Sequence, residues 1–585
     1  MYLHRKIIVL FATVILLSLP ACHPSASKTK NTDVTLQIGA DPGILNPIII
    51  TSNSAGQIIG QVVQTLASID FKSLKEVPVL IKSRPTIEDI KEGPFKGGVK
   101  LSYEIRPEAR WDNGKPITVN DVLFSIKAIL NPLGNADMLR SIFDEIDSIS
   151  YDDPASGKFS IYNKHKTINT EENNGSIPVL PEYFYDSTHI LSKYTISYIR
   201  NPANAEKIKN NPDFIKFSDN FHAEKMNGIH TCGSGAYFIK EYIPGQRVVL
   251  ERKKKWWGDA LMQENTNLEA YATHLTYKVI NDPAAIITEL KAGKIDAVGQ
   301  LSSKDFITLQ NDTHFTAKYY LHTPTDFTYC FIGLNLKNPI LEDINVRRAL
   351  AHLLDIDTYI KTILYGLAYP TVSMEHPSKK EEYNSDIKRL SFDANEAKKL
   401  LASSGWKDLN GDGILDKKIH GKTMPLKLSL LVNKGNTARV QIAELLKNEA
   451  LKVGIQIDIE VQDLNLMTKN ERNHDFDMGF CAWQVVPLRV DPKGTWHTES
   501  INGGNNFVSF GDAASDQLID EIRTELDDAK RIKLYKKFQA MVYDQMPYLF
   551  LYAYKGKVVI SKRFTNAAPS ALRPGYNEAG FKLKD

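Results

Sequence analysis

Few residues of this 585-residue sequence have the types and spacing that catalysis requires. Ser404 and Lys407 match the spacing of a serine nucleophile and its lysine, but Gly405 between them is a predicted helix stop, so we interpret the match as coincidence. The segment from Asp408 to Gly413 begins like a calcium loop, with oxygen ligands at positions one, three and five. Ile419 occupies the twelfth position, where calcium needs a bidentate carboxylate. An Asx-rich turn is the preferred interpretation, and weak calcium binding is the alternative.

The histidines are scattered, and no pair has the spacing of a zinc site. The four that could serve a nickel or metal-chelate ligand are His222, His230, His474 and His497. The sequence has no zinc-protease signature, no phosphate-binding loop, no nucleophile elbow and no dinucleotide-binding glycine motif. We therefore expect no catalytic residue, no cofactor and no resident metal ion.

One cysteine is predicted to carry a covalent modification. A short basic segment and an apolar run, Ile7–Leu17, precede Leu19–Cys22, which resembles a bacterial lipobox. In a lipobox the cysteine becomes the diacylated N-terminus, although Pro20 is an uncommon residue at its position. We expect residues 1–21 to be a signal peptide and 22–32 a flexible, lipid-anchored tether. Such a protein would lie on the periplasmic or extracellular face of a bacterial membrane; a plain secretory peptide is the alternative.

The composition indicates a large protein that forms hydrophobic cores. It has 42% apolar and 24% charged residues, a mean hydropathy of −0.28 and only 4 cysteines, which excludes a disulfide scaffold, a multi-span membrane protein and a wholly disordered chain. Lys and Arg total 72 against 69 Asp and Glu, too small an excess for nucleic acid to be the expected partner. Cys232, Cys330 and Cys481 lie in apolar or glycine-rich segments, so we expect buried thiols and at most one disulfide among them.

Strand-like and helix-like segments alternate along the chain, which predicts an α/β fold with mixed sheets. Asp393 and Glu396 resemble a capping pair for a helix that stops at Gly405. Strict alternation over 455–461 predicts a strand. The other predicted elements are helices over 345–365, 437–453, 518–526 and 534–542, and a buried strand over 548–554.

Several motifs, in order, resemble the family 5 extracellular solute-binding proteins of ABC transporters. The most diagnostic is Leu101–Val122, which has a strand, a turn from Trp111 to Gly114, and Asp121 before a helix. Taken by themselves these residues are structural: Trp111 is expected in the core, and Asp121 is expected to cap the helix that begins at Val122. The other matching segments are Gly43–Pro47, Gly233–Tyr237, Pro244–Arg252, Trp257-Gly258, Leu290–Asp296, Gly333–Asn335, Val346–Leu350, Asn506-Phe507, Arg531 and Pro547-Tyr548.

The resemblance implies a two-lobed periplasmic-binding-protein fold of type II, with hinge strands between the lobes. Lobe 1 would comprise 33–332 and 548–585, and lobe 2 would comprise 333–547. Such a protein captures a solute, here a peptide or peptide-like molecule, between its lobes and delivers it to an ABC permease as a monomer, without chemical reaction. The alternatives are a sensory or scavenging receptor of the same fold and, less favoured, an exported hydrolase.

Candidate ligand contacts follow a predicted strand in lobe 2. Trp483 and Trp496 would offer apolar area, with core packing as the alternative for each. Peptide-binding relatives carry an Asp three residues after the equivalent Trp, and its carboxylate pairs with the α-amino group of the peptide. Here that residue is Val486, which argues against ordinary peptide capture because an unpaired buried ammonium is costly. The remaining candidates are Asp491 as a substitute, Arg489 for an anionic group, Asn46 from the first motif and Tyr552 from the second crossing.

Overall fold

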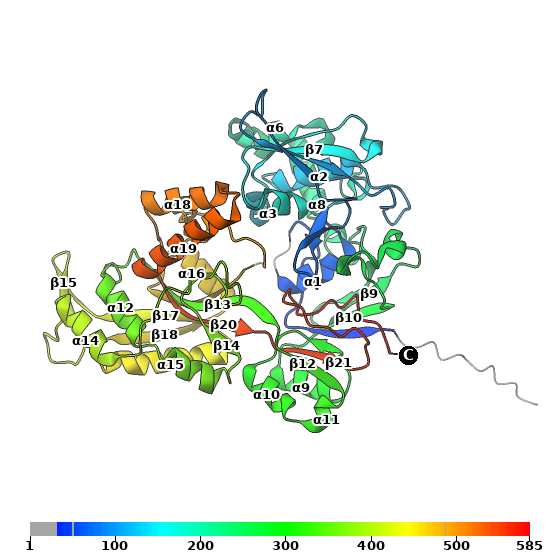
Figure 1. Ribbon diagram of the computed structural model, residues 1–585. Coiled ribbons are helices and arrows are strands. Elements are labelled where there is room, and N and C mark those ends of the chain that lie inside the picture. Colours follow the sequence, from blue (N-terminus) through cyan, green and yellow to red (C-terminus); the bar gives the residue numbers. More distant parts are fainter. Residues whose placement is uncertain (1–31, 50–51, 486, 585) are drawn as a thin grey trace, which may run out of the picture.

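The computed structural model describes residues 32–49, 52–485 and 487–584. The predicted signal peptide, nearly all of the tether, Cys22 and Val486 therefore lie outside the described residues. In the described part of the chain, no helix is both long enough and apolar enough to cross a membrane. The described strands form two large sheets and three smaller ones, and helices pack beside them (Figure 1), so the predicted α/β class with mixed sheets is confirmed.

The first large sheet has seven strands in the order β12-β21-β11-β1-β10-β9-β8. Its parallel centre pairs β1 with β10, and the antiparallel strands β9 and β8 extend it on one side. A separate four-stranded sheet with the order β4-β5-β7-β6 is inserted between β1 and β8 in the sequence. The bounds are β1 Val34–Ile38, β8 Tyr237–Ile243, β9 Arg247–Arg252, β10 His274–Val279, β11 Ala297–Val298, β12 Tyr319–His322, β21 Val558–Ser561, β4 Thr86–Asp89, β5 Val99–Glu104, β6 Ile146–Ser150 and β7 Lys158–Asn163.

The second large sheet has six strands in the order β14-β20-β13-β19-β17-β18. Helices α12, α14 and α15 bury apolar side chains on one of its faces, and α16, α18 and α19 do so on the other. The bounds are β13 Thr325–Leu334, β14 Ala368–Pro370, β17 Lys427–Asn433, β18 Gln456–Gln462, β19 Met478–Gln484, β20 Tyr548–Lys555, α12 Ile344–His352, α14 Ala394–Ser403, α15 Thr437–Leu451, α16 Leu464–Arg472, α18 Ala513–Thr524 and α19 Asp528–Gln545.

The chain passes between the two large sheets at residues 323–324 and 556–557. Strands β13 and β20 lie wholly in the six-stranded sheet, whereas β12 and β21 lie wholly in the seven-stranded sheet. The expected boundaries at 332/333 and 547/548 therefore cut through one sheet and not between two. The two crossings touch, because the Gly556 amide donates to the Pro324 carbonyl at 2.7 Å. A Cβ on Gly556 would lie 2.9 Å from the Pro324 ring, so this close approach requires glycine.

Most of the helices that were predicted from the sequence coincide with helices of the structure. Asp393 caps α14 by accepting from the amides of Asn395 and Glu396, as predicted. The predicted helix over 345–365 is interrupted: α12 ends at His352, and Asp355 caps a new turn by accepting from the Thr358 amide. The capping of the helix after Trp111 differs in position from the prediction: Thr118 is the N-cap, and Asp121 lies in the first turn, where its Oδ2 accepts from the Thr118 amide at 2.9 Å. A side chain that can cap is visible in the sequence, but which of several candidates does so depends on packing.

Candidate functional site: the cleft between the two large sheets

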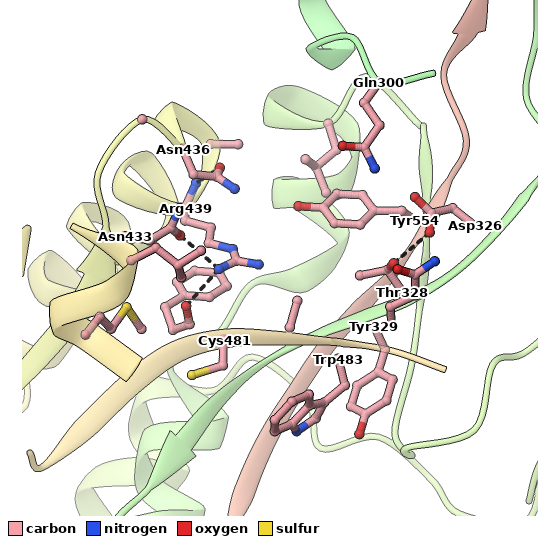
Figure 2. A pocket seen from close by; sticks show the side chains of 18 of the residues that line it. Gln300, Asp326, Thr328, Tyr329, Asn433, Asn436, Arg439, Cys481, Trp483 and Tyr554 are labelled. Atoms are coloured by element: carbon pink, nitrogen blue, oxygen red, sulfur yellow. Dashed lines mark hydrogen bonds between the residues drawn. The ribbon is translucent and has the colours of Figure 1, made fainter. Parts of the chain in front are cut away.

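A cleft of about 2290 Å³ lies between the two large sheets. The seven-stranded side contributes Gly39, Asn281 and the segment 299–305, and the six-stranded side contributes the starts of α15 and α16 together with β19. Pockets for small ligands usually have volumes of about 300–1,000 Å³. The cleft is therefore large enough for a solute of several residues. Figure 2 shows a close view of its lining side chains.

Aromatic side chains form one wall of the cleft. Tyr329 on β13 and Trp483 on β19 are directly opposed across the strand pair and lie side by side in Figure 2. The half-buried indole of Trp483 donates from Nε1 to the Tyr548 hydroxyl at 3.1 Å, which fixes its orientation. Phe507 also lines the cleft, with its ring centroid 6.1 Å from that of Trp483. Such a wall offers apolar area that accepts side chains of different shapes.

A buried cation lies at the N-terminal end of α15. Arg439 is 9% exposed, and its Nη1 donates to Asn433 Oδ1 at 2.9 Å and to the Phe480 carbonyl at 3.0 Å. Its guanidinium also stacks on the Phe480 ring, 5.4 Å from the centroid. Figure 2 shows Arg439 and Asn436 on one side of the cavity, facing Tyr554 across it. The cleft therefore has a positive charge built into one wall.

Polar groups near the crossings form the opposite wall. Asp326 accepts from the Thr328 hydroxyl at 2.6 Å, and Thr328 in turn accepts from Arg573 Nη2 at 3.0 Å. The Lys557 ammonium lies over the Tyr554 ring, 4.8 Å from its centroid, and burial lowers the pKa of this lysine. Asp326 supplies a carboxylate to this wall, and one of its oxygens already accepts a hydrogen bond from Thr328.

Four of the predicted site residues, Trp483, Arg489, Asp491 and Trp496, line the cleft. Asp491 forms a two-point ion pair with Arg523, whose Nε lies 3.1 and 2.9 Å from its two oxygens. Arg489 pairs with Asp528 at 3.1 Å. Asp491 and Arg489 are thus both paired with charged residues of this chain. Of the candidates that line the cleft, Trp483 in the aromatic wall is the one best suited to contact a ligand.

Trp496, Asn46 and Tyr552 are buried in packing or in local hydrogen bonds. Trp496 borders the cleft but is only 2% exposed, and its ring packs against Phe510, Phe538 and Tyr548. Asn46 is fully buried, and its carboxamide bonds to Asn227 and to the Ile48 amide. Tyr552 is fully buried in the apolar cluster beneath α12, α14 and α15. These placements correspond to structural roles.

Trp111 and the segment from Asp408 to Gly413 have structural roles. Trp111 is 4% exposed and donates to Asp121 Oδ2 at 3.3 Å. The Asp408 carboxylate accepts from the amides of Gly411 and Gly413, which makes an Asx turn. No three His, Cys, Asp or Glu side chains lie close enough to hold a metal ion in the described segments. Cys232, Cys330 and Cys481 are free thiols.

Sequence reasoning missed the polar residues of the cleft walls. They come from elements far apart in the sequence, so only the tertiary structure brings them together. The single usable signal was Asn436, an N-cap residue followed three positions later by an arginine on the buried face of an otherwise amphipathic helix. The missed residues are Gln300, Asp326, Thr328, Tyr329, Asn433, Asn436, Arg439, Tyr554, Lys557 and Arg573.

Comparison with known proteins places this cleft among those of bacterial binding proteins. Residues 92–504 match the model of the bacterial extracellular solute-binding proteins, family 5 Middle. The oligopeptide-binding protein AppA of Bacillus subtilis is 25% identical over 92% of this chain and 91% of its own length. The nickel-binding periplasmic protein of Escherichia coli is 23% identical over 60% of this chain and 64% of its own length.

Solved structures show the same fold. AppA of Bacillus subtilis in complex with a nonapeptide matches with a TM-score of 0.74 and 24% identity, covering 94% of this chain and 99% of AppA. NikZ of Campylobacter jejuni in complex with Ni(L-His) matches with a TM-score of 0.72 and 22% identity, covering 95% and 100%. One fold thus holds a peptide in one protein and a metal chelate in another, so the fold alone does not select the ligand.

Proposed function

Because this chain belongs to the bacterial extracellular solute-binding proteins of family 5, a family of binding receptors and not of enzymes, we propose that it captures a peptide or peptide-like solute and delivers it to an ABC permease. The observation that carries the proposal is the cleft of about 2290 Å³ between the two sheets, with its aromatic wall and polar ends. A solute of this size would contact both sheets at once. Its binding would stabilise the closed arrangement, which a permease can recognise.

The two touching crossings support this mechanism. Within the described residues, the backbone connects the two large sheets only at 323–324 and 556–557, so a change of dihedral angles in these short segments can open the cleft. Across the cleft, the Ile168 amide donates to the Arg523 carbonyl at 2.9 Å. A ligand that bridges the sheets would add contacts to the closed form alone.

The proposal places the receptor outside the cytoplasm as a monomer anchored through the acylated Cys22. Two acyl chains give stable membrane attachment without a spanning helix, and a tether of about ten residues would let the lobes reach a permease. Import is the favoured role, and it is supported by the relatives named above, which are binding proteins for oligopeptides or nickel. Permease genes adjoining the gene for this chain would support import, and a neighbouring sensor kinase would support signalling.

The test is ligand capture by the mature protein. Native mass spectrometry of protein as purified should reveal a bound mass that denaturation releases unchanged. A pool of tetra- to nonapeptides should then raise the melting temperature, since an excess of about a hundredfold over Kd adds about 2.7 kcal/mol of stability. An equimolar mixture of the free amino acids is the control. No bound mass together with no shift from the pool would refute peptide capture.

A further inference from the structure

We propose that the N-terminal end of α15 and the guanidinium of Arg439 form an anion subsite that holds a carboxylate of the solute. This inference rests on the proposed function, because the subsite lies in the same cleft. It goes beyond the proposed function because it states which charge the bound solute carries. In this assignment the receptor recognises an acidic group of its ligand, whereas the family's peptide receptors pair an Asp with the ligand's ammonium.

The first observation is that Arg439 is a buried cation without an anionic partner. None of the ion pairs among residues 32–49, 52–485 and 487–584 includes it, and its Nε has no hydrogen-bond partner there. Its Nη1 bonds to neutral acceptors only, and Nη2 lies 3.9 Å from the Cys330 sulfur. A buried charge without a counter-charge costs several kcal/mol, which a bound anion would offset.

Glu471 is an acidic residue close enough to interact with the charge of Arg439, but the two side chains form no ion pair among the described residues. The Glu471 carboxylate accepts from the Cys481 thiol at 2.9 Å. Burial raises the pKa of Glu471 despite the attraction of the guanidinium, because desolvation is the larger effect. The positive charge on this wall therefore remains available to a ligand.

The second observation concerns the backbone at the same place. Residues Gly435–Ala438 line the cleft at the start of α15, a helix of 15 residues. In the part of the chain that the structure describes, their four amides donate to no acceptor, while the Asn436 carboxamide oxygen accepts from the amide of Arg439. Free amides and the positive end of the helix dipole favour an anion at this position.

The third observation is that the cleft offers little to an ammonium. The segment that follows Trp483 has no acidic residue before Asp491. Asp491, which was expected to substitute, is paired with Arg523 at 2.9 Å. Asp326 accepts from Thr328 at 2.6 Å and lies 4.0 Å from Arg573. The cleft lining has seven Lys or Arg side chains against five Asp or Glu side chains, and this balance favours an acidic group on the ligand.

The group that this subsite would bind is a carboxylate. A peptide-like solute can supply it from its free C-terminus or from an acidic side chain. A planar guanidinium suits either one, and the Nε of Arg439, which is buried and has no hydrogen-bond partner among the described residues, could donate to it. The experiment therefore uses three N-acetylated pentapeptide libraries, one with free C-termini, one with C-terminal amides, and one with C-terminal amides and a glutamate in the middle. The N-acetyl group removes the ammonium from all three.

We expect the wild-type protein to bind at least one carboxylate-bearing library tenfold or more tightly than the neutral amide library, measured by isothermal titration calorimetry. The free-acid and glutamate libraries separate the two sources. Arg439→Gln keeps a hydrogen-bond donor but removes the charge, and it should abolish the preference. Arg472→Gln is the matched control, because Arg472 is an exposed arginine that also lines the cleft, and it should retain the preference.

A second variant keeps the proposal testable even if Arg439→Gln does not fold. Thr437 is exposed in the first turn of α15, so Thr437→Glu places a carboxylate where the helix dipole favours it. This variant should fold normally and lose the preference by occupying the subsite. Equal affinity of the wild-type protein for all libraries, or a preference that survives in both Arg439→Gln and Thr437→Glu, would overturn the proposal.

Failure of peptide capture would leave the subsite testable by itself. If none of the libraries binds, succinate and succinamide are compared by thermal shift, because they differ only in charge. A rise in melting temperature with succinate alone that disappears in Arg439→Gln supports the subsite, although peptide capture has then failed. No rise with succinate in the wild-type protein overturns the subsite as well.

Discussion

Replacement of Glu375 by Gln should remove a pH-dependent loss of stability from the lobe that contains the six-stranded sheet. Glu375 is fully buried, and its Oε1 accepts from the His376 amide at 2.8 Å while the Lys379 ammonium lies 3.5 Å away. Its Oε2 has no hydrogen-bond partner in the described part of the chain. Burial outweighs the attraction of Lys379 and raises the pKa of Glu375 from 4.5 to about 7.

The size of the effect follows from this pKa. Between pH 4.5 and about 7 the folded protein retains a proton on Glu375 that the unfolded chain has lost. The free energy of unfolding therefore falls as the pH rises through this interval and is level outside it. At about 1.36 kcal/mol for each pH unit, the loss amounts to about 3 kcal/mol. Glutamine has no proton to lose, so Glu375→Gln should gain this amount over the wild type between pH 4.5 and 8.

The assay is urea unfolding, followed by tryptophan fluorescence at several pH values from 4.5 to 8. Glu382→Gln is the matched control, because Glu382 contacts the same lysine, at 3.2 Å, and also Arg531, at 2.8 Å. Although burial opposes them, these cations hold the pKa of Glu382 below its ordinary value. Glu382→Gln should therefore destabilise the protein by a nearly constant amount from pH 4.5 to 8, because the stabilisation by ionised Glu382 is lost only as the pH falls below 4.5.

The two variants thus have opposite signs at neutral pH. A constant difference between Glu375→Gln and the wild type across the pH range would refute the reasoning, because it would mean that Glu375 titrates normally in the folded protein. Destabilisation by Glu375→Gln at pH 8 would refute it more strongly. In that case the carboxylate would be ionised and would stabilise the lobe through Lys379.

Two further predictions concern the aromatic wall and the N-terminus. Trp496→Ala should lower the free energy of unfolding by about 3–5 kcal/mol, whereas Trp483→Ala should cost about 2 kcal/mol, since its indole is only half buried and loses one hydrogen bond. Trp483→Ala should also weaken peptide-pool binding in the thermal-shift assay; a larger stability loss than that of Trp496→Ala would place Trp483 in the core. Cys22→Ser should move the protein from the detergent phase to the aqueous phase in phase partition, and retention in the detergent phase would contradict acylation.

The sequence predicted those features that depend on neighbouring residues. The α14 cap at Asp393 and the turn at Gly114, with φ of +78°, are set within a few residues of chain, so their patterns are readable. The motifs of the resemblance are mostly of this kind: Trp111 and Asp121 bond to each other and hold the fold. They identify the family and say nothing about the solute.

The tertiary structure decided which strands share a sheet and which charges are free. An apolar run such as Thr325–Leu334 shows that a strand is buried, but only its pairing with β19 and β20 places it in the six-stranded sheet. Asp491 and Arg439 look alike in the sequence, as charged residues near apolar segments. Folding brings Arg523 to Asp491 and brings no carboxylate within ion-pair distance of Arg439 among the described residues. Binding specificity depends on such long-range pairings, which local sequence patterns do not encode.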